Sequence, residues 1–174
     1  GLLRRQRQMC IRDSLNIIEE NIKNVDSIIN LCGILFENKS GDFFRVHTDV
    51  PAFLGKISLK HKLNTLIHVS ALGVSTNSES KYSRSKAEGE NQMLEHFPKG
   101  KILRPSLLFG KGDNFFGQFS EMSKFSPILP VISTSTKFQP VFVEDVAKAI
   151  IKLIKDRKNK NNIYELAGDI IYSF

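Results

Sequence analysis

The sequence predicts an α/β fold in which a parallel β-sheet is flanked by helices. Three apolar runs have the length and composition of buried strands, at residues 25–35, 63–70 and 101–103. Patterns of helical period separate them, so strands and helices alternate along the chain. Such alternation forms βαβ units with right-handed crossovers and parallel strands. In a sheet of this kind, ligands bind outside the carboxyl ends of the strands.

The N-terminal half of the predicted domain alternates helices with strands. Residues 15–23 place apolar side chains at helical spacing, and residues 25–35 are typical of a strand buried on both faces. A polar loop follows at 37–44. Asp49 is predicted to cap the next helix, with Pro51 in its first turn. One face of that helix is apolar, with Val50, Phe53, Leu54 and Ile57.

The C-terminal half continues the alternation. A helix is predicted at 81–97, where Pro98 ends it, and a further strand at 138–143. Glu144 and Asp145 then favour a helix N-terminus. The apolar residues of this last helix are predicted to face the core, and its lysines are predicted to face water.

A Tyr-x-x-x-Lys motif at Tyr82 and Lys86 carries the clearest chemical signal. Helical residues four apart share a face, so the phenol and the ammonium would converge on one ligand, with Ser70 facing them from a strand end. A nearby ammonium lowers the pKa of a tyrosine, and a serine hydroxyl both donates and accepts hydrogen bonds. The three residues are therefore candidates for hydride and proton transfer at a hydroxyl or carbonyl carbon. Chance is the alternative, because the motif alone is weak.

Five short motifs follow one another along the chain. They are Asn30-Leu-Cys-Gly33, His68-Val-Ser70, Tyr82-x-x-x-Lys86-Ala-Glu-Gly-Glu90, Leu103-Arg-Pro-Ser106 with Phe109-Gly110, and Gln139-Pro-Val-Phe-Val-Glu-Asp-Val146. In this order and spacing, they resemble the extended short-chain dehydrogenase/reductase superfamily of the epimerase/dehydratase type. Within it, the run from Ile67 to Val146 most resembles atypical members similar to the NAD(P)H-binding accessory subunit of respiratory complex I.

This resemblance implies a Rossmann-like fold that binds NAD or NADP, with NADPH favoured. It implies that Ser70, Tyr82 and Lys86 hold the catalytic positions of the superfamily. Elements around 109–145 would lie on the substrate side. For residues 109–116, an ordinary Gly-Asp turn before a core aromatic pair is an equally good interpretation. The resemblance also implies a set of cofactor-binding residues: Asp26 near the adenine, Asn30, Cys32 and Gly33 along the cleft, Tyr82 and Lys86, and Pro105 and Ser106 beside the nicotinamide.

The glycine-rich phosphate loop of the superfamily has no counterpart in the sequence. A doubly wound dinucleotide fold begins with a strand, a glycine-rich turn and a helix whose N–H groups bind the pyrophosphate. Residues 1–14 show neither a core pattern nor a signal peptide, and we interpret them as non-native sequencing-adaptor read-through. A natural basic arm is the alternative. Residues 15–174 are then a partial NAD(P)-binding domain, truncated at both ends and expected to be inactive as a fragment, with a late strand at 162–168.

Composition argues against several other classes of function. The formal charge of +7 falls to +4 without residues 1–14, and no interleaving of aromatic and basic residues supports a nucleic-acid partner. No apolar run approaches the roughly 20 residues that span a bilayer. The four histidines lack metal-ligand spacing and are interpreted as structural or surface residues, so no metal site is expected. The two cysteines favour a reduced compartment, and Cys32 is expected to be a small buried apolar residue.

Two functions of different classes remain open. The first is an NAD(P)-dependent oxidoreductase or epimerase that acts on a small-molecule substrate. The second is a non-catalytic NAD(P)H-binding subunit of complex I. The sequence predicts a cytoplasmic protein, which in the second case is peripheral to the inner membrane through its partner. A retained Ser-Tyr-Lys set is compatible with both functions.

Overall fold

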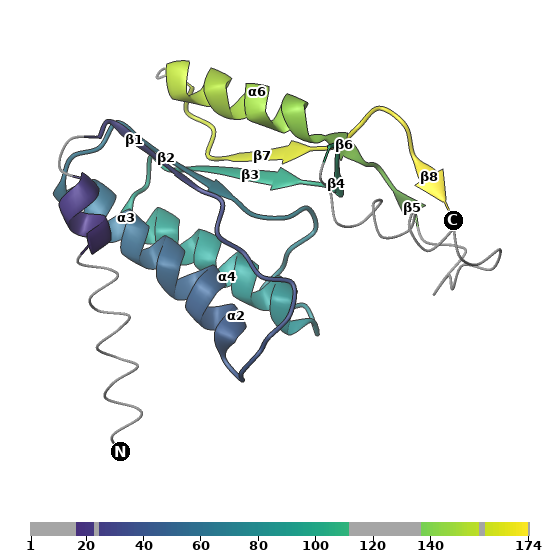
Figure 1. Ribbon diagram of the computed structural model, residues 1–174, viewed down its shortest axis with the longest axis horizontal. Coiled ribbons are helices and arrows are strands. Elements are labelled where there is room, and N and C mark those ends of the chain that lie inside the picture. The colour runs from purple at the N-terminus through teal and green to yellow at the C-terminus, as the bar shows by residue number, and fades with distance from the viewer. Residues whose placement is uncertain (1–16, 23–24, 112–136, 157–158, 174) are drawn as a thin grey trace.

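The computed structural model describes residues 17–22, 25–111, 137–156 and 159–173. In these ranges, the main sheet has four strands, all parallel, in the order β1-β2-β3-β7 (Figure 1). The predicted α/β fold is therefore confirmed, and the late strand predicted at 162–168 is β7. The strands are β1 (Ser27–Asn30), β2 (Thr65–Val69), β3 (Lys101–Pro105) and β7 (Ile163–Leu166).

Helices cover both faces of this sheet (Figure 1). One face carries α3 (Val50–Lys60) and α4 (Lys81–His96), and the other carries α6 (Val143–Lys155). Successive residues of a strand point to opposite faces. Leu66 of β2 accordingly joins the apolar cluster of α3 and α4, whereas Ile67 joins that of α6, and both are fully buried. The core is thus two apolar layers with the sheet between them.

The first strand is shorter and more exposed than the sequence predicts. β1 covers four residues of the predicted run over 25–35, and Ile29, Leu31 and Leu35 are 42, 67 and 69% exposed. The apolar cluster under α6 reaches Ile67 of β2 but includes no residue of β1. The expectation of a strand buried on both faces is therefore wrong for β1, because α6 does not extend over it.

The helical segment before β2 begins earlier than predicted. It runs through α2 (Asp42–Phe44), a π-helical turn η1 (Arg45–Asp49) and α3 without a break. Asp49 is therefore not a cap, because its backbone is already helical and its side chain makes no capping hydrogen bond. Pro51 does lie in the first turn of α3, as predicted. The carboxylate of Glu37 accepts two backbone N–H groups at the start of α2, which accounts for the earlier beginning.

The range of α4 agrees with its predicted range, 81–97, to within one residue. Ser80 caps its first turn, because Ser80 Oγ accepts a hydrogen bond from the N–H of Ser83 at 3.4 Å. The helix ends at His96, and the non-helical Phe97 that follows stands immediately before Pro98, whose ring cannot continue a helix. Local sequence signals therefore fix both ends of this helix.

The strand predicted at 138–143 is divided into two short strands. Two small sheets form. One pairs β5 (Lys137–Phe138) with β8 (Tyr172–Ser173), and the other pairs β4 (Leu108–Phe109) with β6 (Val141–Phe142). Pro140 stands at the division, because it lacks the N–H that a continuous ladder needs. α6 follows β6 directly, with Glu144 and Asp145 in its first turn as predicted.

The remaining expectations concern the chain ends and the membrane. Residues 17–22 are helical, inside the helix predicted at 15–23. Across the described ranges, no helix is both long and apolar enough to cross a bilayer. The interpretations of residues 1–14, and of 112–136 within the substrate-side elements, fall outside the described residues.

Gly89 on α4 allows a direct test of the packing. A Cβ at this position would lie 1.7 Å from the carbonyl oxygen of His47 in η1. Alanine is favoured over glycine by about 1 kcal/mol in a helix interior, but overpacking typically costs about 1–3 kcal/mol, occasionally more. The backbones of α4 and η1 would have to move apart, so the cost of overpacking should exceed the gain in helix propensity. We expect Gly89→Ala to lower the free energy of unfolding of the full-length protein by about 2 kcal/mol, measured by urea titration.

The matched control is Glu88→Ala on the same turn. Glu88 is only partly buried, so this change should alter the free energy of unfolding by less than about 0.5 kcal/mol. A Gly89→Ala variant that is more stable than the wild type would show that the close approach of α4 and η1 is incorrect.

Candidate functional site

The carboxyl ends of β1, β2 and β3 form one edge of the sheet, and most of the predicted site residues lie along it. Asn30 ends β1, Ser70 follows β2, and Pro105 ends β3. The N–H of Ser70 donates to β3 at 2.7 Å, and the N–H of Ser106 donates to β7 at 2.7 Å. These four residues therefore share the edge at which parallel sheets bind ligands.

Asp26 does not lie at this edge. It precedes β1, at the amino end of the strand, and its carbonyl accepts a hydrogen bond from the N–H of Asn64 just before β2. The length of the strand separates it from Asn30, roughly 13 Å at the usual rise per residue. The structure thus gives no support to the expectation that Asp26 lies near the adenine of a bound dinucleotide.

Lys86 connects α4 to the end of β2. Its Nζ donates to the carbonyl oxygen of Val69 at 3.4 Å and lies 6.0 Å from the centroid of the Tyr82 ring. Ser70 is the next residue after Val69, and its Oγ is buried without a hydrogen-bond partner among the described residues. The fold therefore brings Lys86 both to Tyr82 and to the segment that carries the candidate serine.

Burial changes the proton affinity of both helix residues. It raises the pKa of the Tyr82 phenol and lowers the pKa of the Lys86 ammonium. The expectation that Lys86 lowers the pKa of Tyr82 is therefore wrong for this structure. The reason is geometric, because the rings of Phe43 and His47 lie against the Tyr82 ring, whereas the ammonium is directed at the carbonyl of β2.

The loop after β1 passes close to Lys86. A Cβ at Gly33 would lie 3.3 Å from Lys86 Nζ, so the absence of a side chain allows this approach. Cys32 is exposed, which corrects the expectation of a buried apolar residue. The correction follows from the early end of β1, which leaves Cys32 in the loop rather than in the strand. Its N–H donates to Asn30 Oδ1 at 3.0 Å.

His47, which the sequence did not single out, is fully buried beside the candidate triad. Its Nε2 accepts a hydrogen bond from the N–H of Ile34 at 3.0 Å, and its Nδ1 lies 3.0 Å from Ser85 Oγ. Burial, and secondly the Lys86 ammonium, lower the pKa of His47 to about 4. No sequence signal could have found it, because its partners are distant in the sequence.

His68 is a second buried histidine at the same place. Its Nδ1 lies 3.0 Å from Asn30 Nδ2, and its Nε2 has no partner among the described residues. Burial lowers the pKa of His68 to about 3, with smaller contributions from Lys86 and His47. His68 could have been found from the sequence, because it is a histidine inside an otherwise apolar strand. No group of three potential metal ligands occurs in the part of the chain that the structure describes.

A buried ion pair lies one turn beyond Lys86. Arg104 of β3 donates from Nη2 to Glu90 Oε2 at 2.6 Å, and from Nε to both carboxylate oxygens at 3.1 and 3.2 Å. The Glu90 side chain is 3% exposed, and its carboxylate raises the pKa of Arg104. A charge buried this deeply needs its partner. The pair therefore fixes α4 against β3.

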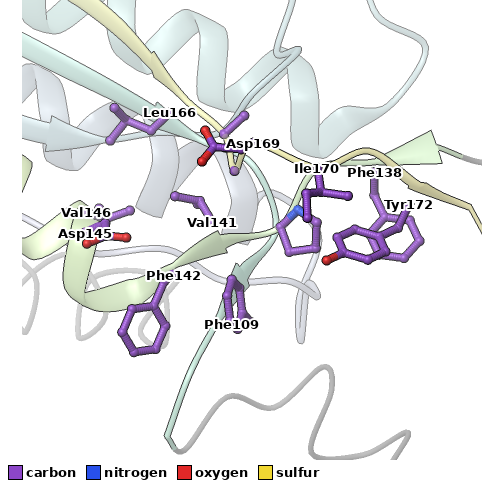
Figure 2. A pocket seen from close by; sticks show the side chains of 13 residues that line it. Phe109, Phe138, Val141, Phe142, Asp145, Val146, Leu166, Asp169, Ile170 and Tyr172 are labelled. Carbon is purple, nitrogen blue, oxygen red and sulfur yellow. The ribbon is translucent and has the colours of Figure 1, made fainter.

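A separate pocket of about 630 Å³ opens beyond the carboxyl end of β7 (Figure 2). Its walls are mostly apolar and aromatic, and they carry two carboxylates, Asp145 and Asp169. No predicted catalytic or cofactor-binding residue is among its described lining residues. Leu166 on its wall, however, pairs with Pro105 in the sheet. The pocket is therefore adjacent to the candidate site, and part of its lining belongs to the elements predicted on the substrate side.

Solved structures share this architecture. The dTDP-4-dehydrorhamnose reductase of Clostridium acetobutylicum matches with a TM-score of 0.77 and 20% identity, over 91% of this chain and 61% of that one. The reductase of Bacillus anthracis, solved in complex with NADP, matches with a TM-score of 0.76 and 18% identity, over 91% and 62%. The chain thus has the fold of the extended short-chain dehydrogenase/reductases, as the resemblance implied.

Sequence comparison then gives the family. Residues 74–173 match the family described as RmlD substrate binding domain, and the chain belongs to this family. It is also similar to NADH dehydrogenase (ubiquinone) 1 alpha subcomplex subunit 9, mitochondrial, with 31% identity over 164 residues in Dictyostelium discoideum and 36% over 153 residues in Mus musculus. These alignments cover 94 and 87% of this chain but 45 and 40% of the relatives. The chain therefore spans less than half the length of these curated relatives.

The two buried histidines predict sensitivity to acid. Their pKa values are lowered in the folded protein, so the unfolded state binds more protons as the pH falls below about 6.5. Their contribution to stability is complete above that pH and is lost towards about pH 4 for His47 and about pH 3 for His68. We expect the free energy of unfolding of the full-length protein to fall over this range by about 3 kcal/mol for His47 and by about 5 kcal/mol for His68, at about 1.4 kcal/mol per pKa unit, measured by urea titration at each pH.

One variant separates this effect from general acid denaturation. His47→Gln should remove the His47 part of the fall and keep the part that His68 contributes. An identical fall in the wild type and in His47→Gln would show that His47 is not the group that titrates.

Proposed function

We propose that the full-length protein binds NAD(P)(H) at the carboxyl edge of β1, β2 and β3. The residues at this edge fit the hydroxyl and carboxamide groups of a dinucleotide. Ser70 Oγ is buried without a partner among the described residues, and Lys86 donates one described hydrogen bond although an ammonium can donate three. Buried groups of this kind are stabilised when a ligand completes their hydrogen bonds. The unpartnered Ser70 hydroxyl is the observation that carries the proposal.

The candidate residues would surround such a ligand from several sides. Asn30, Cys32 and Gly33 would line the cleft at the end of β1, and Pro105 and Ser106 at the end of β3. Lys86 and Tyr82 would contact it from α4. When bound, the nucleotide would supply its nicotinamide ring, which donates or accepts hydride. We favour NADPH, although solved structures of this fold hold either NADP, as in the reductase of Bacillus anthracis, or NAD.

We further propose that the protein is an accessory subunit of respiratory complex I, in which the nucleotide is held and not consumed. The similarity to the mitochondrial subunit 9 of two organisms supports this partner. The arrangement of Lys86 is compatible with the absence of turnover, because its ammonium donates to the carbonyl oxygen of Val69 and no hydrogen bond among the described residues joins it to the Tyr82 phenol. Such a protein would be peripheral to the inner membrane through its partner.

An oxidoreductase acting on an alcohol, a ketone or a sugar nucleotide is the second candidate. The specific observation in its favour is that Ser70, Tyr82 and Lys86 are all present, with Lys86 close to both Tyr82 and the end of β2. In this case, Ser70 would hold the substrate oxygen and Tyr82 would exchange its proton, and the adjacent pocket would take the rest of the substrate.

Nucleotide binding is tested with Lys86→Met in the full-length protein. Methionine keeps most of the volume of the side chain but donates no hydrogen bond. We expect the Kd for NADPH, measured by calorimetry, to rise about tenfold, which corresponds to roughly 1.4 kcal/mol. Lys81→Met is the control, because Lys81 is exposed at the start of the same helix. Equal affinities for NADPH in the two variants would count against the proposed site.

Tyr82→Phe distinguishes the two candidate functions. For the accessory subunit, we expect both the wild type and the variant to bind NADPH, to consume none of it with added carbonyl compounds, and to co-purify with complex I. For the oxidoreductase, the variant should still bind NADPH but lose about 10²- to 10⁴-fold in its rate of oxidation. Tagged wild-type protein that co-purifies with no respiratory complex would overturn the proposal of an accessory subunit.

A further inference from the structure

The loop after β1, residues 31–34, has no regular secondary structure, but two hydrogen bonds to described side chains hold it. The N–H of Cys32 donates to Asn30 Oδ1 at 3.0 Å, and the N–H of Ile34 donates to His47 Nε2 at 3.0 Å. The first bond is local. The second crosses to the π-helical turn η1, so it is the bond that fixes the loop to the rest of the fold.

The hydrogen bonds through His47 share one donor-to-acceptor direction, from the loop after β1 towards α4. Because Nε2 accepts, the neutral imidazole carries its proton on Nδ1, which donates to Ser85 Oγ at 3.0 Å. Ser85 Oγ donates in turn to the carbonyl oxygen of Tyr82 at 2.9 Å. This chain of bonds joins the loop after β1 to the first turn of α4.

Packing on several sides holds His47 itself. Its ring stacks on Phe43, with centroids 5.3 Å apart, and meets Tyr82 edge-on at 5.2 Å. Its carbonyl oxygen lies against Gly89, where a Cβ would not fit. The next residue, Thr48, donates from Oγ1 to the Ser85 carbonyl at 2.9 Å. His47 is therefore a fixed point from which the loop can be positioned.

Gly33 lies between His47 and the candidate cofactor-binding lysine. A Cβ at Gly33 would be 3.3 Å from Lys86 Nζ and 3.9 Å from His47 Nε2. Because Ile34 is the next residue, its bond to His47 sets the distance between the Gly33 backbone and the Lys86 ammonium. Loss of that bond would release the loop at residues 31–34, which forms one wall of the proposed nucleotide cleft, and would leave Lys86 in place.

We propose that His47 is a positioning residue for the nucleotide site: its Nε2 holds the loop at residues 31–34 against α4, and thereby sets the cleft that the nucleotide occupies. His47 acts through the loop and does not itself contact the ligand. This inference rests on the proposed binding of NAD(P)(H) at this edge.

Two isosteric variants of the full-length protein separate the acceptor role of His47 from its packing. In His47→Gln, Oε1 takes the place of Nε2 and can still accept from Ile34. In His47→Asn, the amide group takes the place of Nδ1 and can still bond Ser85, but it cannot reach Ile34. Both variants lose the stacked ring, so a residue that acts only by packing would be affected similarly by the two changes. His96→Gln is the control for an unrelated histidine.

Two measurements are made on each variant: hydrogen exchange at the Ile34 amide by NMR, and the Kd for NADPH by calorimetry. We expect the Ile34 amide to exchange at least about tenfold faster in His47→Asn than in His47→Gln. The Kd for NADPH should rise at least about tenfold in His47→Asn and stay within about threefold of the wild type in His47→Gln. Ser85→Ala should resemble His47→Gln, because it leaves the bond to Ile34 intact.

The possible outcomes separate this inference from the proposed function. Equal exchange at Ile34 in the two isosteric variants would overturn the role of His47 in holding the loop. Faster exchange in His47→Asn with an unchanged Kd would overturn its role in setting the cleft. A wild-type protein that binds no NADPH would overturn the proposed function and the nucleotide part of the inference, while the exchange data would still decide whether His47 holds the loop.

Discussion

The docking of α4 on the parallel sheet is the interaction on which the candidate site depends. Near the C-terminal end of this helix, Met93 and Phe97 are buried in the apolar cluster. One turn earlier, Glu90 forms the buried ion pair with Arg104 of β3. Any shift of the helix along the sheet would leave Glu90 buried without a partner, at a cost of several kcal/mol. The position of Lys86, one further turn along, is fixed as a consequence.

The interface between α4 and the sheet changes from apolar to polar towards the carboxyl edge. On β2, Leu66 belongs to the apolar cluster, whereas the next two residues on the same face of the strand are His68 and Ser70. Most polar groups of this layer have partners, but the described residues offer none to His68 Nε2 or Ser70 Oγ. Burying a polar atom without a partner is costly. An incompletely satisfied layer at a strand edge is therefore typical of a ligand site.

The fold alone does not decide between catalysis and binding. Proteins of this fold include reductases of sugar nucleotides, and similar sequences include a subunit of complex I, so function must be argued from local chemistry. The Ser-Tyr-Lys set is compatible with either function. In this structure, the Lys86 ammonium donates to a backbone carbonyl at the end of β2.

The sequence by itself determined the alternation of strands and helices, the capped helix at 81–97 and the presence of a Ser-Tyr-Lys set, because periodicity, caps and prolines act locally. It could not place His47 beside Ile34, bring the Tyr82 ring against two other rings, or put Asp26 at the opposite edge from Asn30, since each of these facts depends on segments that meet only in the folded chain. The exposure of β1 likewise followed from which elements lie beside it, whereas the division of the strand at 138–143 has a local cause in Pro140, which lacks an N–H. Tertiary packing therefore decided the protonation and hydrogen bonding of the site, because desolvation and long-range contacts set both.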